Sequence, residues 1–435
     1  MPRSQKHNPV LPGSLAVVVG AGASGEAAAR LLCEKGAKVR LLERSPDNVS
    51  QGLLILAGEL GIEIITGPHE PGHFEGASLV VPSPGVPFAM LRPLLEAAGS
   101  PPVLAEMELA YRYTDEPILA VTGTSGKTTT VSLAAAMLEA AGKNVFLGGN
   151  IGTPLSDYVT TVLKGGKKAD VLVLEASSFQ LMGCTTFAPQ VGVLLNISPN
   201  HLDQHESMRE YTEAKFSMFS RQMQGDVALF GAELEDEVPL HKIGGRIEFF
   251  TSPETKWETK LLGAHNQRNI EAAYKACIEF GVSRETAAGA AAAFKPLANR
   301  LELVGEWGGV SYVNDSKCTT VSALEVALKS MENPTLLLVG GVFKGGDLTA
   351  LIPLLKEKVK VVGIFGQSRE IFTKAWEGVV PLFWSATLEE AMRTLRDEAE
   401  KGDTILLAPA TASFDLYPNY VARGADFRRV AELLQ

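Results

Sequence analysis

Short apolar runs alternate with longer amphipathic stretches along most of the chain. Residues 15–44 predict a strand, a glycine turn, a helix and a second strand. The run PILAVT, which ends at residue 122, predicts a buried strand, and the alternation returns after residue 310. Residues 240–262 are rich in β-forming residues and predict a small antiparallel addition. Strands that alternate with helices predict doubly covered parallel sheets, so the expected fold class is α/β.

Chain length and two proline-containing dipeptides indicate how these elements are grouped. At about 150 residues per domain, 435 residues correspond to about three domains. Glu116-Pro117 and Lys295-Pro296 lie between periodic segments, where a chain commonly passes from one domain to the next. We expect an N-terminal Rossmann-like domain, a central P-loop ATPase-like parallel-sheet domain and a C-terminal Rossmann-like α/β domain, over residues 1–112, 113–297 and 298–435.

Composition restricts the class of protein and its partners. With 46% hydrophobic and 21% charged residues, the chain is typical of a soluble globular protein that builds full cores. A net charge of −10 without a basic stripe argues against nucleic acid as a partner. The spacing of the four cysteines fits neither a zinc site nor a disulfide framework, which favours a reducing cytoplasm. No apolar run reaches the ~18 residues of a membrane helix, so we expect a cytoplasmic protein without a membrane span.

The glycine-rich run GTSGKTTT at residues 123–130 carries the strongest chemical signal. Between a strand and a helix, such a turn points backbone N–H groups and the positive end of the helix dipole at one place. Lys127 can lie over the β- and γ-phosphates of a nucleotide there, and the Thr128 hydroxyl can bind Mg²⁺. Val121 stands where the general phosphate-loop pattern has a glycine, so this loop is a shortened variant. We therefore predict ATP and Mg²⁺ as ligands.

A second glycine pattern lies in the N-terminal segment. Gly20, Gly22 and Gly25 follow the first predicted strand, and Glu43 ends the next strand about twenty residues later. In this Rossmann-like arrangement the glycines admit a phosphate close to the backbone, and the acid hydrogen-bonds a ribose or base. The pattern alone does not specify a dinucleotide, because it requires only the close approach of a phosphate.

Polar residues also follow other predicted strands of the central block. Glu175 ends the strand VLVLE, where an acid beside a phosphate loop can bind Mg²⁺ or orient water. His201 and His205 are four residues apart after another strand, but the glutamate of the zinc-binding helix motif is missing, so we predict no zinc pair. Lys215 lies on a predicted helix, where a lysine is exposed by default.

The start of the C-terminal block gathers cationic and polar residues near predicted strand ends. They are Arg300, the run from Asn314 to Lys317, and Lys344, which follows a glycine turn. Ligands of open α/β sheets bind beyond the carboxyl ends of the strands. These residues are therefore candidates for binding anionic groups of a substrate or nucleotide.

Seven motifs, in their order and spacing, resemble the Mur ligase family over nearly the whole chain. They are GTSGKTT, EASSFQL, N-x-S-x-x-H-L-D with YTEAKF, GAHNQRN, NRLE, NDSK and the Gly340-Gly341 turn. The resemblance implies an ATP-dependent ligase that forms an amide. In that chemistry the γ-phosphoryl group of ATP is transferred to a carboxylate, and an amine attacks the resulting acyl phosphate.

The resemblance also implies which residues bind ATP and two Mg²⁺ ions. For ATP they are Gly123, Thr124, Ser125, Gly126, Lys127, Thr128, Thr129, Asn266, Asn269, Arg300 and Asp315. For the metal ions they are Thr128, Glu175, His201 and Lys215, and the catalytic residues are Lys127, His201 and Lys215. Lys215 matches the family's carbamylated lysine, in which the modification turns a cation into an anion that can bind Mg²⁺.

Two further substrates follow from the same resemblance, which is strongest for the branch that adds D-glutamate. UDP-N-acetylmuramoyl-L-alanine (UDP-MurNAc-L-Ala) would be held by Gly22, Ala23, Ser24, Gly25, Glu43, Ser83, Gly85 and Asn150. D-Glutamate would be held by Lys317, Thr319, Lys344, Ser413 and Phe414. We expect a monomer that acts in cytoplasmic peptidoglycan precursor synthesis.

Two departures from the family pattern leave the amino-acid specificity open. Asn299 stands where a histidine often precedes the arginine, and Val342 stands where an aspartate often follows the glycine pair. The Asp-Asn-Pro-Arg motif of relatives that add diaminopimelate or lysine is absent, which favours D-glutamate.

Other functions remain as alternatives. One is a Mur-type ligase with a different amino acid, and another is a folylpolyglutamate synthase type, which the N-terminal nucleotide-type domain disfavours. A nucleotide-dependent regulatory protein would leave Lys127, Glu175, His201 and Lys215 without a chemical role. An NAD-dependent oxidoreductase would use only the N-terminal glycines and leave the phosphate loop unexplained.

Overall fold

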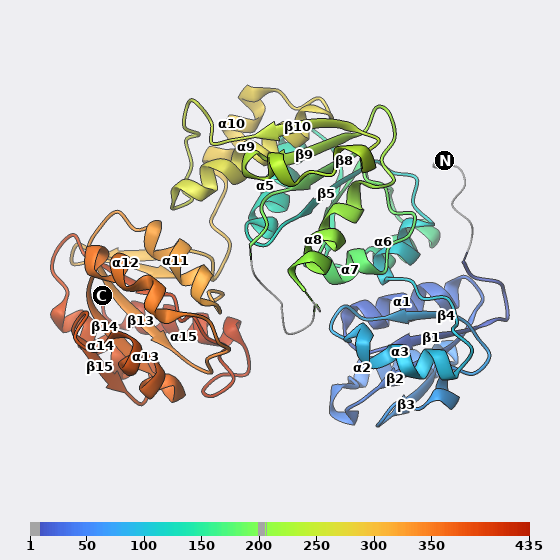
Figure 1. Cartoon of the computed structure of the whole chain (residues 1–435), viewed down its shortest axis with the longest axis horizontal. Coiled ribbons are helices and arrows are strands. Elements are labelled where there is room, and N and C mark those ends of the chain that lie inside the picture. The colour runs from blue at the N-terminus through green and yellow to red at the C-terminus, as the bar shows by residue number, and fades with distance from the viewer. Residues whose placement is uncertain (1–8, 199–204, 206) are drawn as a thin grey trace. The chain divides into compact units, whose positions relative to one another are not determined.

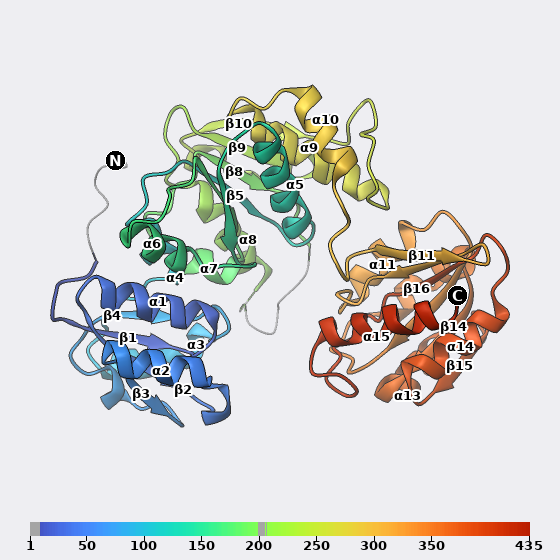
Figure 2. The same cartoon turned by 180° about the vertical axis from the view of Figure 1, so that it is seen from behind.

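The computed structural model describes residues 9–198, 205 and 207–435 (Figures 1 and 2). The chain forms two compact units. The first consists of residues 1–255 and 268–291, and the second of residues 256–267 and 292–435. The predicted limit between the first two domains falls inside the first unit. The limits of the three predicted domains therefore stay a prediction.

The N-terminal part of the first unit is a four-stranded parallel sheet in the order β3-β2-β1-β4, blue in Figure 1. Its strands are β1 (Leu15–Val19), β2 (Lys38–Glu43), β3 (Glu63–Thr66) and β4 (Ala77–Pro82). The helices of this part are α1 (Ala23–Glu34), α2 (Gln51–Leu60), α3 (Phe88–Ala97) and α4 (Glu106–Tyr111). Strand β1 lies between two parallel neighbours and is almost wholly buried, which explains its continuous apolar sequence.

The rest of the first unit is built on a six-stranded parallel sheet in the order β10-β9-β8-β5-β7-β6. Its strands are β5 (Ile118–Thr122), β6 (Val145–Gly149), β7 (Val171–Glu175), β8 (Val191–Leu194), β9 (Val227–Gly231) and β10 (Arg246–Phe250). The helices are α5 (Lys127–Ala140), α6 (Leu155–Leu163), α7 (Ser178–Met182), α8 (Met208–Phe216), α9 (Ala264–Ile278) and α10 (Arg284–Ala293). The predicted central parallel sheet is confirmed, and β5 lies in its interior.

The antiparallel addition expected over residues 240–262 is wrong. Strand β10 pairs with β9 in parallel. The connection between them contains the short 3₁₀ helices Ala232–Glu237 and Leu240–Lys242, so the chain returns to the start of the sheet before β10 begins. A parallel pair requires such a crossover connection, whereas antiparallel strands can be joined by a short turn.

The second unit contains a six-stranded sheet in the order β11-β12-β16-β13-β14-β15. Its strands are β11 (Glu302–Trp307), β12 (Val310–Asn314), β13 (Thr335–Gly340), β14 (Val359–Phe365), β15 (Leu382–Ser385) and β16 (Thr404–Leu407). Its helices are α11 (Val321–Lys329), α12 (Ile352–Lys358), α13 (Arg369–Trp376), α14 (Leu388–Glu398) and α15 (Tyr420–Leu433). The predicted α/β arrangement is confirmed, with one difference. Gly308 and Gly309 have positive φ and close a hairpin, so edge strand β11 is antiparallel to β12.

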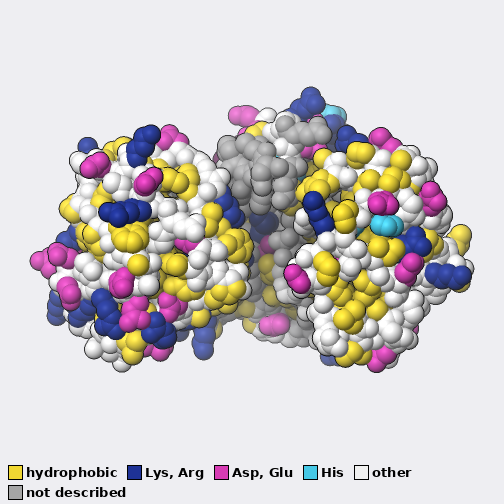
Figure 3. Space-filling model, turned by 90° about the horizontal axis from the view of Figure 1, so that it is seen from below, with side chains coloured by type: hydrophobic (Ala, Val, Ile, Leu, Met, Phe, Trp, Pro, Cys, Tyr) yellow, Lys and Arg dark blue, Asp and Glu magenta, His cyan; other side chains and the backbone are white. Residues whose placement is uncertain are grey.

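The surface shown in Figure 3 carries charges of both signs. Where side chains are coloured by type, Lys and Arg are interspersed with Asp and Glu rather than gathered in one stripe. All four cysteines are free. None of the described helices combines the length and the hydropathy that crossing a membrane requires.

Candidate active site

The phosphate-loop residues lie between β5 and α5, at the carboxyl edge of the central sheet. Gly123 and Gly126 have φ angles of +151° and +84°, which glycine adopts without the steric penalty of a side chain. The N-cap residue of α5 is Gly126, which has no side chain to cap the helix, and a helix N-terminus favours an anion through its N–H groups and dipole. The Lys127 ammonium donates to the carbonyl oxygens of Gly123 (2.8 Å) and Thr124 (2.9 Å). Its positive charge is therefore held directly over the loop.

Helix α8 contacts the loop through two residues one turn apart. The Tyr211 hydroxyl lies 3.0 Å from Oγ1 of Thr124, and Nζ of Lys215 donates to the carbonyl oxygen of Gly123 at 3.0 Å. Residues four apart share a helix face, and Nζ of Lys215 lies 4.4 Å from the centre of the Tyr211 ring. Only 1% of the Lys215 surface is exposed. The default expectation of an exposed lysine is therefore wrong.

The surroundings of Lys215 disfavour its charged form. Burial, and then the positive charge of Lys127, lower the pKa of Lys215 from its ordinary value of 10.5 to about 6, while Glu175 acts in the opposite direction. The two lysines are close because both donate to the carbonyl oxygen of Gly123. At neutral pH the amine of Lys215 is therefore mostly uncharged and nucleophilic.

The carboxylate of Glu175 connects the phosphate loop with a second turn. Its Oε2 accepts a hydrogen bond from the Thr128 hydroxyl (2.7 Å), and its Oε1 accepts one from Nδ2 of Asn150 (2.8 Å). Strand β7 pairs in parallel with β5, which places Glu175 beside Val121 in register. Thr128 and Glu175, both predicted to bind Mg²⁺, are thus in direct contact. Their hydroxyl and carboxylate oxygens are of the kind that Mg²⁺ prefers.

Of the two histidines that follow β8, His201 and His205, the structure describes only His205. His201 lies outside the described residues. His205 is buried, with Nε2 2.9 Å from the Ser178 hydroxyl, and its ring stacks on Phe179 and meets the Tyr211 ring edge-on. It therefore supports Tyr211 behind the phosphate loop, a role that the sequence did not predict. Within the described part of the chain, no three His, Cys, Asp or Glu side chains cluster so as to hold a metal ion.

An open cavity of about 510 Å³ gathers the residues predicted to hold UDP-MurNAc-L-Ala. It is lined by Gly22, Ala23, Ser24, Glu43, Ser83, Gly85 and Asn150. Gly25 is the exception, because it packs behind the cavity, where a Cβ atom would overlap the carbonyl oxygen of Gly20. Gln180 also lines the cavity. Gln180 was not predicted to bind a ligand, although it belongs to the EASSFQL motif.

Glu43 fixes the turn around this cavity. Its Oε2 accepts from the backbone N–H of Ala21 (2.8 Å), and its Oε1 accepts from the N–H of Ser45 and Nδ2 of Asn48 (3.0 Å each). Burial alone would raise the pKa of Glu43, but these hydrogen bonds outweigh it and the pKa is lowered. The carboxylate is therefore held ionised and in place at the end of β2.

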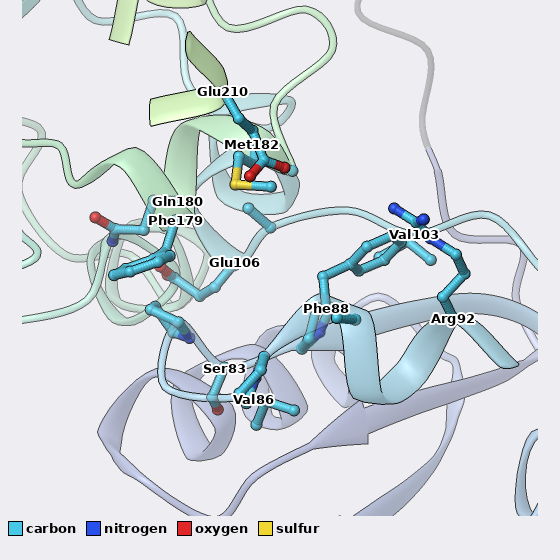
Figure 4. Close-up of a pocket in the computed structure, with 16 residues that line it drawn as sticks. Ser83, Val86, Phe88, Arg92, Val103, Glu106, Phe179, Gln180, Met182 and Glu210 are labelled. Carbon is cyan, nitrogen blue, oxygen red and sulfur yellow. The ribbon is translucent and has the colours of Figure 1, made fainter. Parts of the chain in front are cut away.

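A second, more apolar cavity adjoins the first. The two share Ser83, Val86 and Gln180 among their lining residues. Figure 4 shows Ser83 and Val86 on the loop that follows β4, with Phe179 and Gln180 facing them from α7. A change at Ser83 or Gln180 would therefore alter both cavities.

The predicted nucleotide contacts beyond the loop lie on both units. In the first unit, Oδ1 of Asn269 lies 2.6 Å from where a Cβ atom at Gly126 would stand, so Asn269 packs against the loop. One turn earlier on the same helix, at the limit between the two units, Asn266 is buried and its Nδ2 donates to the carbonyl oxygen of Leu262. Arg300 and Asp315 belong to the second unit. Burial raises the pKa of Asp315 to about 7, against the opposing effects of a backbone hydrogen bond and of the Arg300 charge.

The residues predicted to hold D-glutamate follow three adjacent strands of the second unit. Lys317 and Thr319 follow β12, Lys344 follows β13, and Ser413 and Phe414 follow β16, which lies between the other two strands. Ser413 is buried, whereas Phe414 is 71% exposed.

Two contacts hold these segments in place. The ammonium of Lys317 lies over the Tyr420 ring, 5.2 Å from its centre. Val342 and Ala412 exchange two backbone hydrogen bonds, which join the segments of Lys344 and Ser413.

Known proteins match this arrangement along its full length. A family model described as the Mur ligase middle domain matches residues 121–238, and one described as the Mur ligase glutamate ligase domain matches residues 299–411. A model of an NAD(P)-binding Rossmann-like domain matches residues 18–49. The UDP-N-acetylmuramoylalanine–D-glutamate ligase of Nitratidesulfovibrio vulgaris (strain DP4) is 55% identical over 431 residues, which cover 99% of each chain. The chain belongs to the Mur ligase family.

More distant proteins share the fold of this Mur ligase. A ligase of the same name from Lawsonia intracellularis is 47% identical over 414 residues, which cover 95% of this chain and 93% of that protein. The structure of UDP-N-acetylmuramate-alanine ligase MurC from Thermotoga maritima matches with a TM-score of 0.59 at 16% identity, over 97% of this chain and 100% of that one. MurF ligase from Thermotoga maritima in complex with ADP matches with a TM-score of 0.58 at 18% identity, over 100% and 96%.

The two departures of this Mur ligase from the family pattern differ in their surroundings. Asn299 is buried with φ of +63°, a conformation that asparagine tolerates. Its Oδ1 accepts from Asn314 (3.0 Å) and its N–H donates to Glu302 (2.9 Å), so it joins the start of β11 to β12. Val342 is 36% exposed beside the segment of Ser413. Of the two, Val342 is therefore the one placed to contact a ligand.

Proposed function

We propose that this Mur ligase joins D-glutamate to UDP-MurNAc-L-Ala, with ATP converted to ADP and phosphate, in peptidoglycan precursor synthesis. The observation that carries the proposal is the 55% identity, over 99% of both chains, to a relative named UDP-N-acetylmuramoylalanine–D-glutamate ligase. The γ-phosphoryl group passes to the L-alanine carboxylate. The D-glutamate amine then attacks the acyl-phosphate carbonyl, the amide bond forms, phosphate leaves and the nitrogen loses a proton.

The phosphate loop would stabilise the charge on the transferred group. Lys127 lies over the loop, and the first turn of α5 offers N–H groups and the positive end of its dipole. The contacting oxygens of Thr128 and Glu175 suit Mg²⁺, which commonly takes one or two carboxylates and substrate phosphates as ligands. Bound Mg²⁺ would neutralise negative charge on the phosphates. We assign His201 and Lys215 to a second ion.

Lys215 would act as a carbamate. Its mostly neutral amine can attack CO₂, which forms an N–C bond and releases a proton. The product is an anion that the positive charge of Lys127 attracts, whereas that charge repels the protonated form of the amine. Its two oxygens would supply an anionic metal ligand that an ammonium group cannot provide.

The large cavity of the first unit would hold the UDP portion of the substrate. Gly22 and Ala23 stand at the N-terminus of α1, where phosphate oxygens are favoured, and Glu43 is fixed in the ionised state. Asn150 lines this cavity and contacts Glu175, so it connects UDP-substrate binding to the proposed metal site. We further propose that the enzyme acts as a monomer in the cytoplasm.

A substrate panel tests the proposed reaction. Purified protein is expected to release phosphate from ATP only when UDP-MurNAc-L-Ala and D-glutamate are both present. The same assay is run with D-aspartate, L-alanine and L-glutamate in place of D-glutamate. Equal turnover with one of these would assign a Mur-type ligase of different amino-acid specificity, the alternative that the exposed Val342 keeps open.

Two alanine variants separate the proposed roles of the lysines. Lys127→Ala should lower phosphate release by about a hundredfold or more, because a phosphate-binding charge is lost. Lys215→Ala should lose activity that formate or acetate in solution partly restores, since a small carboxylate can take the place of the carbamate. Lys127→Ala is the matched control, because a carboxylate cannot replace an ammonium group. Equal rescue of both variants, or of neither, would contradict the carbamate.

A further inference from the structure

The side chain of Arg423, on the first turn of α15, is fully buried with 0% of its surface exposed. Burial lowers its pKa to about 10, so the guanidinium stays charged at neutral pH. Among the described residues, none of its hydrogen-bond partners is a carboxylate. The negative charge of Asp415 favours the charged form of Arg423. Its carboxylate, however, accepts a hydrogen bond from the N–H of Gln367 and not from Arg423. A buried cation without an ion pair is costly, so fold stability alone does not account for it.

All five N–H donors of the guanidinium have acceptors. Nε donates to the Ser316 hydroxyl (3.1 Å), and Nη2 donates to the carbonyl oxygens of Ser316 (2.8 Å) and Thr411 (3.1 Å). Nη1 donates to the carbonyl oxygen of Gly340 (3.3 Å) and to Oγ1 of Thr411 (3.4 Å). Arginine has five such donors in a rigid fork, so the side chain has no N–H left for a ligand.

These acceptors belong to three neighbouring strand ends. Ser316 follows β12, Gly340 is the last residue of β13, and Thr411 follows β16, which lies between them in the sheet. The segments that follow β13 and β16 also bond each other, through Val342 and Ala412 and through the Thr411 hydroxyl, which donates to the carbonyl oxygen of Gly340 (2.6 Å). Arg423 adds hydrogen bonds to all three segments, so one side chain ties the segment after β12 to the other two.

The same three segments carry the residues proposed to hold D-glutamate. Lys317 follows Ser316 directly, Ser413 lies two residues after Thr411, and Lys344 lies beyond the Gly340-Gly341 turn. At Gly341, a Cβ atom would overlap Thr411 and stand 3.1 Å from Nη1 of Arg423, so the turn rests on the guanidinium. No contact to substrate is needed for Arg423 to affect binding there.

We infer that Arg423 is a positioning residue for the amino-acid substrate, which holds the segments of Lys317, Lys344 and Ser413 at the spacing that binds D-glutamate. The inference rests on the proposed function. It predicts that substitution of Arg423 raises the KM for D-glutamate much more than the KM for ATP or for UDP-MurNAc-L-Ala. A residue that only stabilised the fold would lower the amount of active enzyme and leave each KM unchanged.

The test is steady-state kinetics of Arg423→Met, Arg423→Lys and Thr411→Val in the full-length enzyme. Arg423→Met keeps the bulk but no donors, and the KM for D-glutamate should rise about tenfold or more, the effect of losing about 1.4 kcal/mol of binding. Arg423→Lys keeps the charge and up to three donors and should fall between Met and wild type. Thr411→Val keeps Arg423 but removes one of its acceptors and the hydrogen bond that the same hydroxyl donates to Gly340, and should raise the KM about threefold. The KM values for ATP and UDP-MurNAc-L-Ala should change less than about threefold.

Val430→Ala is the matched control, because Val430 is fully buried on the same helix but contacts a different part of the core. It should weaken the second unit, as tryptophan fluorescence during urea unfolding reports, without changing the KM for D-glutamate. Equal increases of all three KM values, or an unchanged KM for D-glutamate in Arg423→Met and Thr411→Val, would overturn the inference. Lack of D-glutamate-dependent turnover in the wild type would instead reject the proposed function.

Discussion

The carbonyl oxygen of Gly123 accepts hydrogen bonds from two lysines, Lys127 and Lys215. Burial disfavours a charge on the inner ammonium group, and repulsion by the other ammonium group adds to that cost. Lys215 is the buried member, so it gives up its proton while Lys127 faces the loop. The arrangement thereby places one cation, which can bind phosphate, and one neutral amine beside the same carbonyl oxygen.

This pair predicts a pH-dependent stability. Between about pH 6 and 10, the unfolded chain holds a proton on Lys215 that the folded chain has lost. The free energy of unfolding should therefore rise with pH, by up to about 1.4 kcal/mol per pH unit from this site. Below about pH 6 both states hold the proton and the contribution to the slope vanishes. Lys215→Met has no such group, so the wild type should gain stability relative to this variant as the pH rises.

Urea unfolding in buffer free of CO₂ measures this difference. Circular dichroism is the suitable signal, because Trp257, Trp307, Trp376 and Trp384 all lie in the second unit and Lys215 lies in the first. Lys242→Met, at an exposed lysine of the first unit, controls for the loss of a positive charge. A stability difference between wild type and Lys215→Met that does not vary with pH would contradict a neutral Lys215.

At the scale of elements, the sequence predicted segments whose contacts are local. Strand β5, its glycine turn and α5 follow from an apolar run, a glycine pattern and a helical period, and the structure contains all three. The β-forming residues of β10 do not determine whether it pairs with β9 in parallel or antiparallel. The connection between the two strands determines that direction. Arg423 had no motif of its own, since its acceptors lie 12 to 107 residues away in the sequence.

The packing of α1 against β1 gives a prediction about one glycine. Gly25 is buried, and a Cβ atom there would overlap the Gly20 carbonyl oxygen and lie 2.9 Å from the Ser83 hydroxyl. Gly25→Ala should therefore destabilise the first unit by about 3 kcal/mol, since helix and strand must move apart. It should also weaken binding of the UDP substrate, because Gly22 and Ser83 line that cavity.

Gly58→Ala is the matched control for this change. Gly58 is an exposed residue of α2 with no atom within 4 Å of the added Cβ, so the substitution should stabilise the helix by up to about 1 kcal/mol. Urea unfolding followed by circular dichroism compares the two variants. If both substitutions shift the unfolding midpoint in the same direction, close helix–strand packing is not what requires glycine at position 25.

At the scale of the whole molecule, the predicted contacts of a single ATP are divided between the two units. The loop residues 123–129 and Asn269 belong to the first, and Arg300 and Asp315 belong to the second. Asn266 lies one turn before Asn269 on α9, the helix in which the limit between the units falls. A nucleotide can engage both sets only if the units come to a defined separation. The segment near residues 295–300, which follows the last crossing of the chain between units, is the predicted hinge.

Small-angle X-ray scattering can test this closure. The radius of gyration should fall when a non-hydrolysable ATP analogue, Mg²⁺ and UDP-MurNAc-L-Ala are added together, because their binding energy favours the closed arrangement. The double variant Arg300→Ala/Asp315→Ala keeps the phosphate loop and should bind the nucleotide without compaction. An unchanged radius of gyration in the liganded wild type would contradict a hinge. A ligand drives closure only through groups that it contacts better in the closed state. Equal compaction of the wild type and the double variant would therefore show that the closing contacts are made by residues other than Arg300 and Asp315.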